Sequence, residues 1–208
     1  MTLKDDLHDV DLFLNRIAAD FASLRPILAR IQQAGAPTLT RLEVPWLSQL
    51  GTDAAYSNSD CGPACVAMWL RYLSIQKTVD DVSRATGLHA GYTYTLPGQL
   101  ITAASAFGLK LQRLINLSID DLAERIDAGQ PAIALVHYAS LSVRYDQKFR
   151  AGHWVLACGY DDQGVLYHDP YWPDTTGRFV KSARSDFAKA MADCSIDGNT
   201  PNQGLVQA

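Results

Sequence analysis

Cys61 stands in the stretch SDCGPACVAMWL, just ahead of a strongly apolar run. The run predicts a buried helix over residues 63–74, in which Pro63 occupies the first turn, where its missing N–H does no harm. A sulfur at this helix edge lies near unpaired backbone N–H groups and the positive end of the helix dipole, and both favour the thiolate. The position therefore favours a nucleophilic thiol, and the alternative is an inert cysteine of the core.

Gly62 follows the cysteine and has no side chain that would block the approach of a substrate carbonyl. We therefore expect Gly62 at the substrate-binding surface. The backbone N–H of Cys61 is a candidate donor to the negative oxygen that forms when a thiolate attacks a carbonyl. These two features fit acyl-transfer chemistry.

A nucleophilic thiol needs a general base, and the base needs a group that orients it. The histidines of the chain are His8, His89, His137, His153 and His168. The first lies on a predicted surface helix, and the second lies in a turn without an obvious partner. The third ends a strand candidate and is equally well explained as a core histidine. The last two share one predicted hairpin, which separates their roles.

The stretch GHWVLACGYDDQGVLYHDPYW, residues 152–172, predicts two apolar strands joined by the turn DDQG. If the loop centres on the two aspartates, His153 and Asp169 fall opposite or diagonal to each other on one face. Their Cβ atoms are then about 5 to 8 Å apart, which allows an imidazole–carboxylate hydrogen bond. Alternation along the strands turns Cys158 and His168 to the other face. His153 is thus the candidate base and Asp169 its orienting group, unless the pair is only a structural hydrogen bond.

These motifs resemble the papain-like family of bacteriocin-processing, double-glycine leader cysteine peptidases, and especially its free-standing members. The resemblance rests on VPWLSQ, DCGPACVAMWLRYL, the helix-loop region as far as FGLKL, and the hairpin, and it covers about residues 42–175. It implies a papain-like fold and a peptide or protein substrate. It also implies that Cys61 is the nucleophile, His153 the general base and acid, and Asp169 the residue that fixes the imidazole tautomer.

Gln49, in the same comparison, matches the glutamine whose amide donates to the oxyanion. Transporter-linked members place this glutamine only a few residues ahead of the cysteine, whereas twelve positions separate Gln49 from Cys61 here. Gln49 is therefore the least certain member of the predicted site, and an exposed polar residue is the alternative.

The remaining substrate-binding candidates are residues that flank the catalytic motifs, namely Gly152, Trp154, Trp172 and the loop tyrosines Tyr92 and Tyr94. Trp154 is equally well explained as a core residue. Cys65 lies one turn after Cys61, but a CxxxC pair without further ligands at zinc spacing is a weak metal signal, and we interpret Cys65 as packing. The predicted chemistry needs no metal and no organic cofactor.

The secondary-structure elements that must position these residues are predicted as helices first along the chain and strands afterwards. This order predicts an α+β fold with an antiparallel sheet. The further predicted helices are 79–86, 97–107, ended by Gly108, and 119–128, capped by Ser118 with Asp121 and ended by Gly129. The predicted strands are 109–114, 132–138, 153–160 and 165–169. We make no prediction for the turn-rich tail DCSIDGNTPNQGLVQA, residues 193–208.

The first 33 residues carry a separate pattern of apolar residues at alternating steps of four and three. This spacing predicts a long amphipathic helix with a heptad seam. Pro26 should kink or end it, and packing on the rest of the chain is the alternative to a coiled coil. We predict residues 1–36 as this helix and a linker, and residues 37–208 as the peptidase domain. Self-association, docking on another protein and covering the cleft are the roles left open for the helix.

Composition excludes several classes of function. The chain has 208 residues and a net charge of -4 without a Lys/Arg run, so nucleic acid is not an expected partner. The first residues carry acids where a secretory signal carries basic residues, and no apolar stretch approaches the roughly 20 residues of a membrane span. We expect a cytoplasmic protein whose four sparse cysteines are free thiols.

The sequence therefore predicts a cysteine peptidase or related amide hydrolase that works through a thioester acyl-enzyme. An acyl or peptidyl transferase with the same triad is one alternative. A non-catalytic binding module, anchored to an assembly by the N-terminal helix, is the other. The chain has no membrane span and no GxxxxGK[ST] motif, so the export role of transporter-linked relatives does not transfer.

Overall fold

The computed structural model describes residues 39–50, 59–87, 94–194 and 200–208, together with Ile17 and Leu24. The chain divides into two units, residues 1–38 and 39–208. The predicted N-terminal helix, apart from its two described residues, lies outside the described part, as do His8, His89 and Tyr92. The helix and the domain boundary at 36/37 stay predictions, and the description below concerns the second unit.

Strands from distant parts of the described chain form one antiparallel sheet in the order β2-β7-β3-β4-β5-β6, with β1 paired to β4. The strands are β1 (Thr40–Arg41), β2 (Leu111–Ile115), β3 (Ala132–His137), β4 (Gly152–Tyr160), β5 (Gly164–His168), β6 (Val180–Ala183) and β7 (Gln203–Gln207). The longest of them, β4, lies between β3 and β5 and carries His153. The hairpin motif therefore predicted β4 and its neighbour β5.

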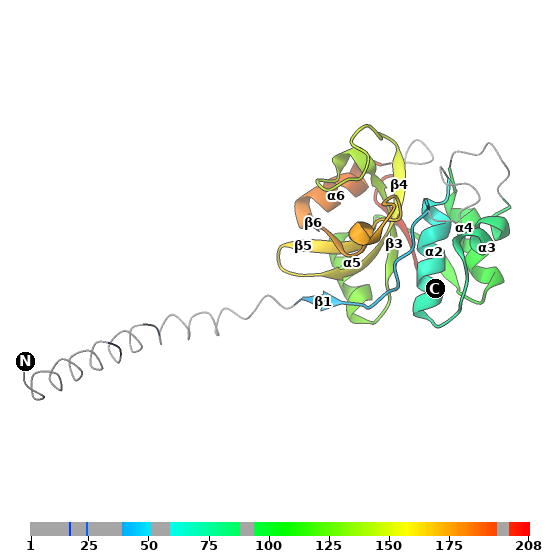
Figure 1. Ribbon diagram of the computed structural model, residues 1–208, viewed down its shortest axis with the longest axis horizontal. Coiled ribbons are helices and arrows are strands. Elements are labelled where there is room, and N and C mark those ends of the chain that lie inside the picture. The colour runs from blue at the N-terminus through cyan, green and yellow to red at the C-terminus, as the bar shows by residue number, and fades with distance from the viewer. Residues whose placement is uncertain (1–16, 18–23, 25–38, 51–58, 88–93, 195–199) are drawn as a thin grey trace, which may run out of the picture. The chain divides into compact units, whose positions relative to one another are not determined.

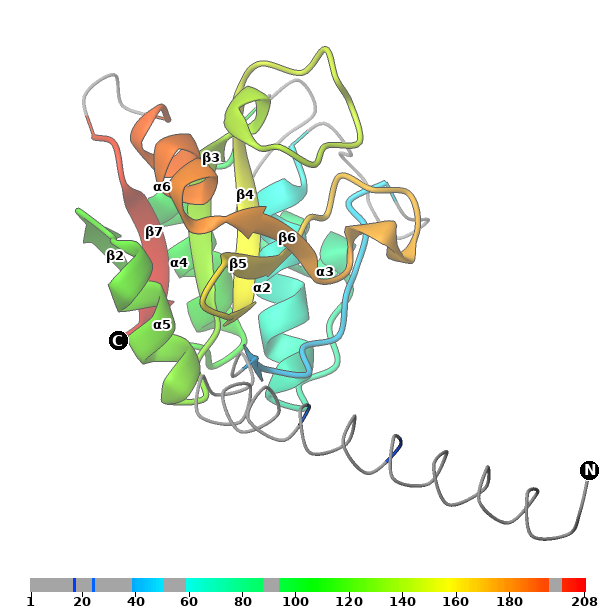
Figure 2. The ribbon, with the colours of Figure 1, turned by 90° about the vertical axis from the view of Figure 1, so that its left-hand side faces the viewer.

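Helices cover both faces of this sheet. They are α2 (Cys61–Tyr72), α3 (Val79–Ala85), α4 (Pro97–Ala106), α5 (Ile119–Asp127) and α6 (Arg184–Ala192), with short 3-10 turns η1 (Tyr138–Ser140) and η2 (Thr175–Gly177). Figure 1 shows α2, α3 and α4 gathered on one side of the strands, with α5 and α6 on the other. Figure 2 looks onto the face that α5 and α6 cover, with α2 behind the strands. The α+β prediction is confirmed.

Local capping signals explain where the predicted helices begin and end. Ser118 and Asp121 form a reciprocal capping box at the start of α5, with N–H to oxygen distances of 2.8 and 3.1 Å. Gly129 follows α5 with φ of +76°, and Gly108 follows α4 with φ of +85°, both in the left-handed region that glycine adopts without strain.

The helix α2 begins earlier than the sequence predicted, at Cys61 rather than at Pro63. Asp60 occupies the N-cap position, and its carboxylate accepts a 2.6 Å hydrogen bond from Ser83 Oγ of α3 instead of capping α2. Gly62 and Pro63 both fit in the first turn, so the cysteine is part of the helix. The thiol is thereby held on the end of a rigid element.

Two hydrophobic cores lie on the two faces of the sheet. Trp154, Leu156 and Cys158 of β4 pack into the core that also holds α2 and α4. Val155 and Ala157 pack into the other core, on the side of α5 and α6. This alternation is the one predicted for the strand, and it fixes the face to which every second side chain of β4 points.

Candidate active site

Cys61 is the first residue of α2, and the residues that follow it in the helix are almost all buried. Its own side chain is partly exposed, and all four cysteines are free. The first backbone N–H groups of a helix have no partner within it, and the helix dipole is positive at that end. The thiol therefore stands where a negative sulfur is stabilised and where a substrate can reach it.

His153 and Asp169 come from neighbouring strands. His153 is the second residue of β4, and Asp169 directly follows the last residue of β5. Ala157 pairs with Tyr167, and continuing this register sets Asp169 opposite Val155, diagonal to His153. His153 Nε2 donates to Asp169 Oδ1 over 2.7 Å, and both side chains are buried. The hydrogen bond fixes the imidazole from the side of the sheet.

Cys61 lines the cleft together with this imidazole, and its side chain is one of the groups that raise the pKa of His153. Because Nε2 is occupied by Asp169, Nδ1 is the ring nitrogen left to interact with the thiol. Burial by itself lowers the pKa of His153, but the charge and hydrogen bond of Asp169, together with the contact to Cys61, outweigh it and raise the pKa to about 9. The imidazole is therefore protonated near neutral pH, in contact with a thiol at a helix N-terminus. A charged imidazole and a thiol thus lie on the same cleft, which is an arrangement suited to nucleophilic catalysis.

Asp169 is held by further donors besides His153. The N–H of Tyr171 donates to Oδ1 over 2.9 Å, and the hydroxyl of Tyr138 donates to Oδ2 over 3.1 Å. The carboxylate is completely buried. A buried charge is tolerated only when it is paired and hydrogen-bonded, and these three donors meet that condition.

Gln49 reaches the site although twelve positions separate it from Cys61 in the chain. Its backbone N–H donates to the carbonyl oxygen of Pro170 over 2.8 Å, and Trp46 Nε1 donates to the carbonyl of Asp169 over 3.2 Å. The segment that carries Gln49 is thus bound to the turn that follows Asp169. Gln49 is buried and lines the same cleft as Cys61.

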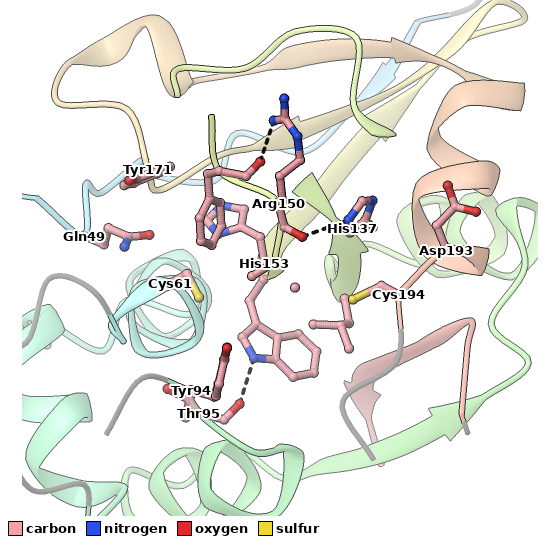
Figure 3. Close-up of a pocket in the computed structure, with 15 residues that line it drawn as sticks. Gln49, Cys61, Tyr94, Thr95, His137, Arg150, His153, Tyr171, Asp193 and Cys194 are labelled. Atoms are coloured by element: carbon pink, nitrogen blue, oxygen red, sulfur yellow. Dashed lines mark hydrogen bonds between the residues drawn. The ribbon is translucent and has the colours of Figure 1, made fainter. Parts of the chain in front are cut away.

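A cleft of about 720 Å³ connects these groups. Its walls are formed by Gln49, Cys61, Tyr94, Thr95, Leu135, His137, Phe149, Arg150, Ala151, Gly152, His153, Trp154, Tyr171, Asp193 and Cys194. In Figure 3, Cys61 and His153 face each other, Gln49 and Tyr171 lie on one side of this pair, and Asp193 and Cys194 lie on the other. An extended chain laid in the cleft would pass the thiol.

The predicted substrate-binding residues divide into two groups. Gly152 and Trp154 line the cleft, and the Trp154 indole N–H donates to the carbonyl of Thr95 over 2.9 Å. Gly62 and Trp172 are not among the residues that line it. A Cβ on Gly62 would lie 2.8 Å from the Leu100 side chain and 3.0 Å from Trp154, so the reason for glycine here is packing beneath the cleft.

Two cysteines of the core lie outside the candidate site. Cys65 is completely buried, and burial raises its pKa well above the ordinary value, with a smaller contribution from Cys61. Cys158 lies 3.8 Å from His168, on the face of the hairpin away from His153. Burial lowers the pKa of His168 to about 4, and its Nε2 donates to the Val44 carbonyl. Neutral and hydrogen-bonded, His168 is a structural histidine.

Sequence reasoning missed several residues around the candidate triad Cys61, His153 and Asp169. Tyr138, Phe149 and Tyr171 pack their rings around His153, with centroid distances of 4.9, 6.3 and 5.9 Å. Cys194 follows α6 and reaches the cleft beside Gly152. The aromatic residues near the HDPYW motif gave a signal for Tyr171, but no local pattern marks Tyr138 or Cys194. Among the described residues, no group of three or more His, Cys, Asp or Glu side chains is arranged to hold a metal ion.

Solved structures with the same fold include peptidases. A C39-like peptidase from Bacillus anthracis is 20% identical, with a TM-score of 0.60, covering 82% of this chain and 97% of its own. The peptidase domain of Streptococcus ComA, a bi-functional ABC transporter, is 14% identical with a TM-score of 0.50, covering 81% of this chain and 98% of its own. A double-glycine-motif protease from an AMS/PCAT transporter, solved with its leader peptide, is 17% identical with a TM-score of 0.50, covering 81% and 94%. The fold is that of the papain-like cysteine peptidases.

The model of the peptidase C39-like family matches residues 41–193, and the chain belongs to that family. The family resemblance inferred from the motifs is confirmed. No curated protein sequence matches the chain. None of the helices in the described part of the chain is long and apolar enough to cross a membrane.

Proposed function

We propose that this chain cleaves a peptide bond by acyl transfer, with Cys61 as nucleophile, His153 as general base and acid, Asp169 as the orienting group and Gln49 as an oxyanion donor. The observation that carries the proposal is the buried 2.7 Å bond from His153 to Asp169, with the Cys61 thiol on the same ring inside an open cleft. A core histidine would not need a buried carboxylate behind it and a thiol in front of it.

In the first half of the reaction, the Cys61 thiolate attacks the substrate carbonyl carbon and forms a carbon–sulfur bond. The carbonyl π electrons move to the oxygen, where the Cys61 N–H and the Gln49 amide stabilise the charge by a few kcal/mol. Protonated His153 then gives its Nδ1 proton to the leaving nitrogen as the carbon–nitrogen bond breaks. The products of this half are an amine and a thioester on Cys61.

In the second half, neutral His153 removes a proton from water, and the water oxygen attacks the thioester carbonyl. Collapse of this second intermediate breaks the carbon–sulfur bond and releases a carboxylic acid. The proton on His153 and the thiolate of Cys61 are thereby restored. Asp169 keeps Nδ1 directed at the reacting atoms in both halves because it holds Nε2.

The substrate is a peptide or protein segment in an extended conformation. The volume of about 720 Å³ and the mixture of aromatic and polar walls suit several consecutive residues. The AMS/PCAT double-glycine protease was solved with a bound leader peptide, which supports a peptide ligand for the same fold. An amine in place of water would turn the same acyl-enzyme into a transferase.

The test is a peptide-library cleavage screen that compares the wild type with Cys61→Ala and with Cys65→Ala. We expect no cleavage by Cys61→Ala, because this variant lacks the proposed nucleophile. The control Cys65→Ala should cleave like the wild type, because Cys65 is buried one turn away from Cys61. Mass spectrometry of the products separates hydrolysis from transfer to an added amine. Equal, slow alkylation of all four thiols by iodoacetamide, with no cleaved peptide, would instead support the binding-module alternative.

A further inference from the structure

Tyr138 occupies a place beside the triad that sequence motifs do not reveal. It is the first residue of η1, directly after β3, and its side chain is completely buried. Its hydroxyl donates to Asp169 Oδ2, while His153 and Tyr171 donate to Oδ1. Among the described residues, no other donor to Oδ2 is found. The phenol therefore fixes the oxygen that His153 does not use.

The hydrogen bond from Tyr138 to Oδ2 restricts the rotation of the Asp169 carboxylate. Rotation about the terminal side-chain torsion of Asp169 would turn Oδ1 away from His153, and such sp² torsions are broad and weakly restrained by themselves. A hydrogen bond at each oxygen removes that freedom. The Tyr138 ring also meets the imidazole edge-on, with centroids 4.9 Å apart and planes at 75°. One side chain thus restrains both partners of the His153–Asp169 pair.

The hydroxyl remains a donor at every working pH. Burial raises the pKa of Tyr138, and the neighbouring charge of Asp169 raises it further. The phenol oxygen in turn accepts a 2.9 Å hydrogen bond from the backbone N–H of Tyr145. Tyr145 belongs to the loop that carries Phe149 and Arg150, both of which line the cleft. The phenol therefore connects a cleft wall to the triad carboxylate.

We propose that Tyr138 is a positioning residue of the reaction, which acts through Asp169 by holding its carboxylate in the orientation that aims the imidazole at Cys61. This role rests on the proposed peptidase function. The chemistry requires no proton transfer from Tyr138, only that its O–H bond to Oδ2 persists through both halves of the reaction. Loss of the hydroxyl should therefore affect the chemical step rather than substrate binding.

The test is Tyr138→Phe, with Tyr167→Phe as matched control. Tyr167 is also a completely buried tyrosine whose hydroxyl has a partner, Ser182, 3.2 Å away, but its hydroxyl is not bonded to the Asp169 carboxylate. We expect kcat of Tyr138→Phe to fall about 10- to 100-fold with KM nearly unchanged, as for other lost bonds to a charged group. The control should stay within about twofold of the wild type for both constants. In the Asp169→Ala background, Tyr138→Phe should have no further effect on kcat, because the group it orients is gone.

A second readout does not depend on the identity of the substrate. The rate of iodoacetamide alkylation of Cys61 is measured against pH, and its upper transition marks loss of the His153 proton. The titratable groups that face His153 are Asp169, Cys61, Tyr138, Tyr171 and Cys194. A carboxylate that turns away supports the imidazolium less, so the transition should move to lower pH in Tyr138→Phe and stay in place in Tyr167→Phe. A purely structural role would change the melting temperature without moving this transition.

These results separate the two proposals. If Cys61→Ala cleaves peptides as well as the wild type, the peptidase proposal fails, while the alkylation profile still tests Tyr138. If Tyr138→Phe keeps the wild-type kcat and upper transition, the positioning role is wrong. Should Tyr138→Phe not fold, proton NMR of the wild type decides: a slowly exchanging Tyr138 hydroxyl resonance that is lost in Asp169→Ala supports the role, and its absence from the wild type overturns it.

Discussion

At the scale of single residues, the proposed chemistry depends on how His153 holds its proton. The side chain is buried, and burial opposes a charged imidazole. Asp169 reverses that balance because it is an anion within hydrogen-bond distance and is itself fixed by Tyr138 and Tyr171. The pKa of about 9 is therefore a property of the group of residues, and removing one charge should change it.

The pH dependence of cleavage follows from this balance. We expect kcat to fall above about pH 9, where His153 loses the proton that the leaving nitrogen needs. In Asp169→Asn the shape of the side chain is kept and the charge is removed, so the alkaline limit should move down by about one pH unit or more, toward the ordinary histidine value of about 6.5. Steady-state kinetics from pH 5 to about 10.5 measure the alkaline limit of the wild type and that of Asp169→Asn. An unchanged limit in Asp169→Asn would contradict the assignment of His153 as general acid.

The same group makes folding stability depend on pH. The pKa of His153 in the folded chain is about 9, above the ordinary value of about 6.5 expected for an unfolded chain. Its contribution to the free energy of unfolding is thus fully present below about pH 6.5 and is lost as pH rises through about 9. Urea unfolding of the wild type should show this decrease, and His153→Ala should show less of it.

At the scale of elements, the sequence predicted those parts whose signals are local. The α5 capping box and the terminal glycines of α4 and α5 lie within a few residues of the boundaries that they set. The β4–β5 hairpin was predicted because its turn residues directly follow and precede its strands. Asp161 Oδ1 accepts the N–H groups of Gln163 and Gly164, which is the contact that the DDQG pattern indicates.

The strand β7 carries no such local signal and was not predicted. It lies in the turn-rich tail, yet it is inserted between β2 and β3 and is almost wholly buried. Its short QGLVQ sequence carries little alternation of its own, and its burial comes from the neighbours on both sides. Likewise, no spacing rule connects Tyr138 or Cys194 to a catalytic motif. Tertiary pairing determines these positions, and one sequence does not reveal it.

Substitution of Gly62 tests how closely α2 packs against its neighbours beneath the cleft. In Gly62→Ala the new Cβ would lie 2.8 Å from Leu100, which is completely buried, and 3.0 Å from Trp154, whose indole N–H is held by the Thr95 carbonyl. We expect the free energy of unfolding to fall by about 1 to 3 kcal/mol, as in other overpacked cores. Urea denaturation measures the change.

The matched control is Gly98→Ala, since a Cβ at Gly98 meets no atom within 4 Å and the residue lies in α4. Its stability should be unchanged or should rise by up to about 1 kcal/mol, because alanine restricts the unfolded chain. Equal effects of the two substitutions would mean that the close packing beneath Cys61 does not limit this position.

At the scale of the whole molecule, the site is assembled from two layers. One layer, α2 with its neighbours α3 and α4, supplies the thiol; the sheet supplies the imidazole and the carboxylate (Figure 1). The two layers share one hydrophobic core, and the other face of the sheet packs on a second core, so each group is held by packing that does not depend on substrate. Cys61 and His153, the proposed nucleophile and base, therefore meet at the junction of the layers, where the cleft lies.

The N-terminal 36 residues are proposed as a separate helical segment, and self-association through the heptad seam is the role, among those left open, that can be tested most directly. Apolar residues at steps of four and three leave a stripe that gains stability only when another surface covers it. We expect sedimentation equilibrium to give an oligomer for the full chain and a monomer for a chain that begins at Thr38. Leu14→Lys places a charge in the predicted seam and should also give a monomer, whereas Asn15→Lys, one position away, should not. If the segment serves assembly, the truncated chain, Leu14→Lys and Asn15→Lys should all still cleave peptides. A full-length chain that is itself monomeric would contradict the predicted heptad seam.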